Sequence, residues 1–100
     1  MKRTLRLLVV LSCFLTACGG PTAAECASNT DTYSSYGKAF ITTNCTSCHQ
    51  HSSQFSTQSA VQTSATSMES EISSGKMPEG ISLSTTERAR VIAWLGCGAP

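Results

Sequence analysis

The chain has 100 residues, of which 40% are hydrophobic and 13% charged, and its formal net charge is +1. A chain of this length holds one small domain at most. Seven Lys and Arg residues form no basic patch or stripe, so the composition gives no support to nucleic-acid binding.

The first residues have the layout of a secretory signal peptide. Lys2, Arg3 and Arg6 precede and enter an apolar run over residues 5–15. At about eleven residues, this run is too short to cross a bilayer about 30 Å thick as a helix. We therefore expect residues 1–17 to be cleaved from the chain, which would be exported.

The residues around Cys18 resemble a bacterial lipobox, because that cysteine follows Leu15-Thr16-Ala17. The resemblance implies cleavage after Ala17, a diacylglyceryl group on Cys18 and acylation of the new N-terminus. Several acyl chains on one residue give stable membrane attachment, whereas one is marginal. Gly19 favours the outer membrane in the enterobacterial sorting pattern, so we expect a lipid-anchored protein of the periplasm. An ordinary cleavage site is the alternative.

Residues 18–32 are small and polar and include Pro21, which predicts a lipidated linker before a domain over residues 33–100.

From Cys18 onward the chain has four basic and six acidic side chains, a net charge of −2. A domain this small buries only about 60% of its unfolded surface. Its many Ser and Thr residues leave few large apolar side chains, so it needs support from crosslinks or a bound group.

A first helix is expected over about residues 32–43, where large apolar side chains repeat at helical spacing. It leads directly to the segment CTSCH at residues 45–49. This motif is typical of c-type haem attachment. The thiols of Cys45 and Cys48 would bond the two vinyl groups at one edge of a haem, and His49 would bring a nitrogen to the iron.

The CTSCH segment has three other interpretations. A thioredoxin-like redox pair needs a βαβ setting, and no such pattern surrounds Cys45. A structural zinc site needs two further Cys or His ligands at matching spacing, and only His49, His51 and distant cysteines are available. A chance match is the third, in a chain with six cysteines.

Residues 56–74 are expected to form one or two short helices, held weakly because Ser and Thr are frequent. The glycine and proline of residues 75–78 break this pattern and place Met77 on a loop. Its thioether can reach the iron from the side opposite His49, or it caps the haem edge. Met68 is the rival ligand, but its spacing predicts a buried helix position. His51 follows His49 too closely to reach the other face.

The last helix has the clearest signals. Ser84 and Glu87 form a capping box, and the apolar residues Val91 and Leu95 follow before a stop at Gly96.

The remaining cysteines indicate a disulfide. Cys13 leaves with the signal peptide, Cys18 is assigned to lipid and the two thiols of the CTSCH segment to haem, so Cys26 and Cys97 remain. In an oxidising compartment such a pair is expected to bond, and closing a loop of about 70 residues is worth about 4 kcal/mol. Two free thiols are the alternative.

With CTSCH near its start, Met77 before a proline in a late loop and helices at both ends, the chain resembles the small class I cytochromes c over about residues 33–98. The resemblance implies an all-α fold whose N- and C-terminal helices pack together around one covalent haem c. It also implies close packing at Gly37, with Trp94 nearby, and electron transfer through an exposed haem edge.

The chain departs from that family in two ways. Met77 follows His49 by 28 positions, fewer than in many members, and the proline-bearing segment that often follows the haem histidine is absent. Residues 50–55 must therefore support His49 in another manner.

The function expected from the sequence is electron transfer by a membrane-tethered mono-haem cytochrome that cycles between Fe(III) and Fe(II) and transforms no substrate. Its partners would be redox proteins that the sequence does not identify. One alternative is a haem-based sensor or peroxidase-like enzyme in which Met77 is displaced, although Arg88, Arg90 and His51 form no recognisable distal set. Another is a subunit docked permanently to a larger oxidoreductase.

Overall fold

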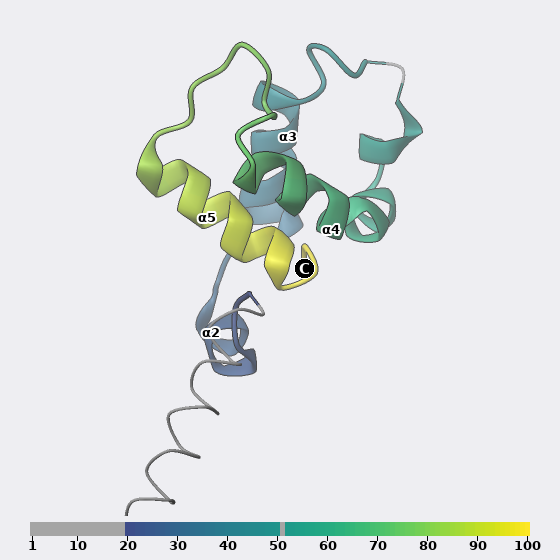
Figure 1. The fold of residues 1–100 in the computed structure, drawn as a ribbon. Coiled ribbons are helices and arrows are strands. Elements are labelled where there is room, and N and C mark those ends of the chain that lie inside the picture. The colour runs from purple at the N-terminus through teal and green to yellow at the C-terminus, as the bar shows by residue number, and fades with distance from the viewer. Residues whose placement is uncertain (1–19, 51) are drawn as a thin grey trace, which may run out of the picture.

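The computed structural model describes residues 20–50 and 52–100. Within these ranges the chain is helical and has no strand, which confirms the all-α prediction (Figure 1). The signal peptide, the proposed lipid site at Cys18 and the side chain of His51 lie outside the described residues. The elements are α2 (Ala23–Ser28), the π-helical turn η1 (Tyr33–Gly37), α3 (Lys38–Asn44), the 3-10 turn η2 (Ser53–Phe55), α4 (Gln58–Ser73) and α5 (Thr85–Gly96).

Helix α2 lies inside the segment predicted to be a linker. Thr22 and Glu25 form a capping box, because the Thr22 hydroxyl accepts from the Glu25 N–H at 3.2 Å and the Glu25 carboxylate accepts from the Thr22 N–H at 3.0 Å. Cys26 on this helix forms a disulfide with Cys97, at a Cα–Cα distance of 5.5 Å. Residues 23–28 of the predicted linker are therefore helical and bonded to the end of α5.

The predicted first helix is formed by η1 and α3 together. It begins at a second capping box, in which Thr32 and Ser35 exchange side-chain and backbone hydrogen bonds. The Thr32 carbonyl accepts from the N–H groups of both Tyr36 and Gly37, so the first turn is wider than an α-turn. Helix α3 then continues to Asn44, one residue beyond the predicted end.

Helices α4 and α5 pack against each other. The weakly predicted region is one continuous helix, α4, capped at Thr57 and buried along one stripe. Helix α5 starts at the predicted capping box, where the Ser84 hydroxyl accepts from the Glu87 N–H at 3.1 Å. Arg88 of α5 donates to the carbonyl of Ile72 near the end of α4, which ties the two helices together.

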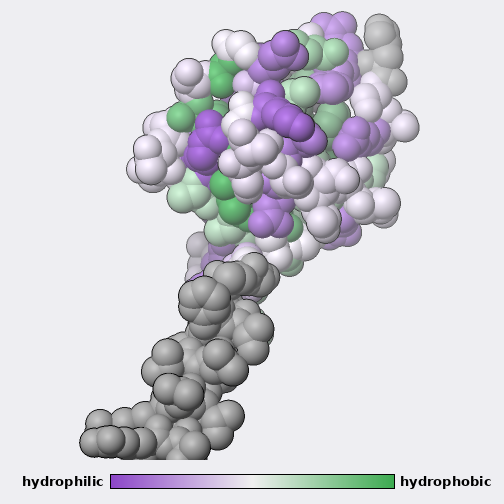
Figure 2. Space-filling model, viewed as in Figure 1, coloured by the Kyte–Doolittle hydropathy of each residue, from purple (hydrophilic) through white to green (hydrophobic). Residues whose placement is uncertain are grey.

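The core is centred on Trp94, whose side chain is fully buried. Tyr36 packs edge-on against it, with ring centroids 6.0 Å apart. Most other buried side chains are aliphatic, and Ile81 is the one large hydrophobic side chain that the described part of the chain exposes. The face in Figure 2 carries mostly hydrophilic and near-neutral residues, with hydrophobic ones in small separate areas. The core is Tyr36, Phe40, Ile41, Val61, Ala65, Met68, Ile72, Val91, Trp94, Leu95 and Ala99.

No helix in residues 20–50 or 52–100 combines the length and the apolar character that a membrane span requires.

Candidate haem site

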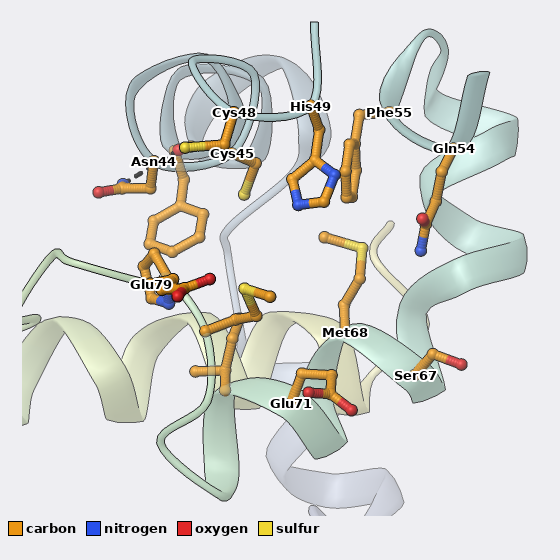
Figure 3. A pocket seen from close by; sticks show the side chains of 14 residues that line it. Asn44, Cys45, Cys48, His49, Gln54, Phe55, Ser67, Met68, Glu71 and Glu79 are labelled. Atoms are coloured by element: carbon orange, nitrogen blue, oxygen red, sulfur yellow. Dashed lines mark hydrogen bonds between the residues drawn. The ribbon is translucent and has the colours of Figure 1, made fainter. Parts of the chain in front are cut away.

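A cavity of about 330 Å³ lies between the end of α3, the turn η2, helix α4 and the loop that leads to α5. It brings together side chains that are distant in sequence. The four residues predicted to hold the haem all line it, and they are Cys45, Cys48, His49 and Met77. Figure 3 shows the two cysteines and His49 on one side of this cavity and α4 on the other.

The CTSCH segment continues α3 for one more turn. The N–H of Cys45 donates to the Ile41 carbonyl at 2.9 Å, and the N–H of His49 donates to the Cys45 carbonyl at 3.0 Å. In such a turn, residues three and four positions apart share a face. Cys45, Cys48 and His49 therefore lie on the same face of this turn. The spacing of the motif thus places both thiols and the imidazole at the cavity.

The two thiols differ in their surroundings. Cys48 is exposed, whereas Cys45 is half-buried beside the core. Burial raises the pKa of the Cys45 thiol to about 11, because a thiolate there would lose its hydration. A redox-active cysteine instead needs a lowered pKa. The neutral thiol of Cys45 suits attachment to an apolar group better than that role.

The imidazole of His49 points into the cavity beside Phe55 (Figure 3). The two rings meet edge to face, with centroids 5.3 Å apart and an interplanar angle of 70°. Phe55 belongs to η2, within the short segment that had to support His49 in place of a proline. The sequence did not single out Phe55, although it is the only large apolar residue between His49 and Val61.

Met77 reaches the cavity from the loop after α4. Its N–H donates to the carbonyl of Glu71 at 3.1 Å, which fixes the loop against the last turns of that helix. Its side chain is half-buried and packs on the core. Glu71 itself also lines the cavity, which no motif in the sequence indicated. It follows Met68 by three residues on α4, and this spacing places both side chains on the same face of the helix.

Met68 is buried, as its helical spacing predicted, with 6% of its surface exposed. It nevertheless lines the cavity, and Figure 3 shows its side chain extending from α4 toward the His49 imidazole. The structure thus places two thioethers at the cavity wall, one on a helix and one on a loop.

The residues at the cavity include the donor groups that a haem would need. Among the described residues, no three His, Cys, Asp or Glu side chains are grouped so that they could hold a metal ion. The cavity instead combines two thiols, one imidazole and thioether sulfur with an apolar wall that includes Phe40, Ile72 and Pro78. Those are the groups that would be needed to bond a large flat apolar ring at its edge and coordinate its iron from both faces.

Both arginines that could have served a distal site are engaged elsewhere. Arg88 donates to the Ile72 carbonyl, and Arg90 forms two hydrogen bonds to Asp31, at 2.8 and 2.9 Å. Neither lines the cavity.

Comparison of the chain with protein-family models, with curated proteins and with solved structures gives no match, so its function has to be inferred from the residues that line this cavity.

Proposed function

We propose that the chain is a mono-haem c-type cytochrome with a class I cytochrome c-like fold, tethered by lipid at Cys18, that carries electrons. One observation carries this proposal: Cys45, Cys48, His49 and Met77 line a single cavity, although Met77 belongs to a separate segment. The haem, when bound, supplies one-electron chemistry between Fe(III) and Fe(II).

Cys45 and Cys48 would hold the group covalently. Each thiol would add across one vinyl group, with a carbon–sulfur bond formed at one vinyl carbon and the thiol hydrogen passed to the other. The resulting thioethers are uncharged, which suits the half-buried position of Cys45. Cys48 is exposed, so a group bonded to it would be within reach of a redox partner.

His49 and Met77 would supply donor atoms to the iron. Phe55 orients the imidazole through its edge-to-face contact, and the hydrogen bond to Glu71 holds the Met77 backbone. Histidine with methionine raises the reduction potential relative to two histidines. The apolar wall formed by Phe40 and Ile72 excludes water from this region.

The close packing of η1 on α5 supports the cytochrome c-like fold. A Cβ atom added to Gly37 would stand 2.1 Å from Cζ2 of Trp94, so these two segments approach as closely as a glycine allows. This contact is the one that the resemblance to class I cytochromes c implied. The haem then completes a core that the short chain does not fill alone.

An electron carrier is favoured over a peroxidase-like enzyme by the polar groups of the cavity. Such an enzyme needs a positioned acid–base pair on the open side of the iron. Arg88 and Arg90 bind other partners and do not line the cavity, so the carboxylates of Glu71 and Glu79 at its wall have no arginine beside them to complete such a pair.

The experiment is expression of the full chain in a bacterial host that attaches haem, followed by intact-mass measurement under non-reducing conditions and visible spectroscopy. We expect a coloured protein whose mass includes one haem. The double variant Cys45→Ala/Cys48→Ala serves as the matched control and should lack that added mass. A colourless wild-type protein with the mass of polypeptide and lipid alone would overturn the proposal.

A further inference from the structure

The first described residues are fixed to one end of the domain. The disulfide of Cys26 with Cys97 bonds α2 to the residue that follows α5. Pro21 lies against the last residue of α5, since a Cβ added to Gly96 would be 2.8 Å from Cδ of Pro21. We call α2 together with residues 96–100 the anchored end.

Only a short segment of chain separates the anchored end from Cys18, the residue proposed to carry the lipid. Cys18 precedes Pro21 by three residues, and a fully extended chain spans at most about 3.6 Å per residue. A lipid on Cys18 therefore lies within about 11 Å of Pro21.

The cavity lies at the opposite end of the domain. The N–H of Tyr33 donates to the Pro100 carbonyl at 2.6 Å, which places the start of η1 at the anchored end. From there η1 and α3 carry the chain to Cys45, a distance of about 15 Å or more at the rise of a helix. No residue of α2 or α5 lines the cavity, and Figure 1 shows α2 beyond the end of α3 that is remote from Cys45.

We propose that the anchored end faces the lipid bilayer and that the haem cavity opens away from it, toward a water-soluble redox protein. The inference rests on the lipid and haem of the proposed function. A reach of about 11 Å cannot carry the lipid around a domain whose cavity is about 15 Å or more distant. The exposed side chains of α2 suit this position, because Ala23, Ala24 and Ala27 are small and uncharged and Glu25 is the only charge on the helix.

The test is hydrogen exchange, read by mass spectrometry, on the full lipidated holoprotein in vesicles of phosphatidylethanolamine and phosphatidylglycerol. The reference is the Cys18→Ser form, which carries no lipid, in the presence of the same vesicles. We expect slower exchange at the anchored end and unchanged exchange at residues 45–56 and 75–82. Slower exchange at the cavity loops instead would overturn the inference.

A second variant tests whether the short tether, rather than an affinity of the anchored end for the bilayer, causes the protection. Inserting 20 Gly and Ser residues after Gly19 gives a flexible spacer with a mean reach of roughly 25 Å. This variant should lose most of the protection at the anchored end while it keeps its lipid and haem. Equal protection in both forms would contradict the role of the short tether.

The outcomes also distinguish this inference from the proposed function. The exchange pattern does not depend on iron chemistry, and intact mass reports haem and lipid separately. A chain with haem but no acyl chains on Cys18 would overturn the orientation while it left the electron carrier standing.

Discussion

Gly37 and Trp94 approach each other so closely that a Cβ on the glycine would lie 2.1 Å from Cζ2 of the indole. This glycine is buried and its backbone is right-handed helical, so what matters is its missing side chain rather than an unusual conformation. The contact joins the segment that leads to the haem motif with the last helix.

Gly37→Ala should therefore destabilise the domain. The added methyl group has to push Trp94 out of a fully buried site, and overpacking of this kind costs about 1–3 kcal/mol. Urea unfolding followed by circular dichroism would measure the change. Ala39→Ser, on the exposed side of α3, is the matched control and should change the free energy of unfolding by less than about 0.5 kcal/mol.

Removal of the disulfide should cost more. Cys26 and Cys97 are 71 positions apart, and a crosslink of that span restricts the unfolded chain by about 4 kcal/mol. We expect Cys26→Ser/Cys97→Ser to unfold at lower urea concentration by a corresponding amount. Dithiothreitol should reproduce this loss in the wild-type protein and have no effect on the variant. An unchanged midpoint in the variant would show that the crosslink does not stabilise the fold.

Met77→Leu and Met68→Leu form a matched pair, because leucine nearly conserves the volume of methionine and removes the sulfur. Met77→Leu should abolish the thioether-to-ferric-iron charge-transfer band and lower the reduction potential. Met68→Leu should retain the band and the potential within error. The reverse pattern would assign the axial position to Met68, which also lines the cavity.

The ion pair of Asp31 with Arg90 should give stability a dependence on pH. Hydrogen bonds from Arg90 hold the pKa of Asp31 below its ordinary value, and the positive charge of Arg90 acts in the same direction. A carboxylate with a lowered pKa contributes stability that is fully present above about pH 4 and is lost as the pH falls through the folded-state value.

Asp31→Asn should accordingly be less stable than the wild type at pH 7, and the difference should shrink as the pH falls below about 4 and through the folded-state pKa of Asp31. Because half of the Arg90 side chain is solvent-exposed, the effect should be small and weaken at high salt. Thermal unfolding of the two proteins across this pH range tests it. A difference that stays constant down to the lowest pH would rule out titration of Asp31 as the cause.

The sequence predicted the elements whose signals are local. The capping box at Ser84 and the apolar stripe after it placed α5, and the spacing of Tyr36 with Phe40 placed the first helix. The single long helix α4 was predicted less well, since its many Ser and Thr residues weaken propensity. Its continuity comes from the buried stripe, which packs against other elements and therefore depends on tertiary structure.

Two features of the structure could not be read from local patterns. Helix α2 lacks apolar periodicity, and the signal that was available, the capping box of Thr22 with Glu25, is short and stands among turn-forming residues. The positions of Phe55 beside His49 and of Met68 at the cavity wall depend on how α4 and η2 meet the end of α3. Such contacts link residues whose spacing in the chain carries no recognisable motif.

The bond between Cys26 and Cys97 determines which thiols stay free. In an exported chain that emerges N-terminus first, Cys26 would encounter Cys45 and Cys48 before Cys97 had appeared. A disulfide from Cys26 to either of them would consume a sulfur atom that the proposed haem attachment requires. The pairing of Cys26 with Cys97 leaves both cysteines of the CTSCH segment free for that attachment.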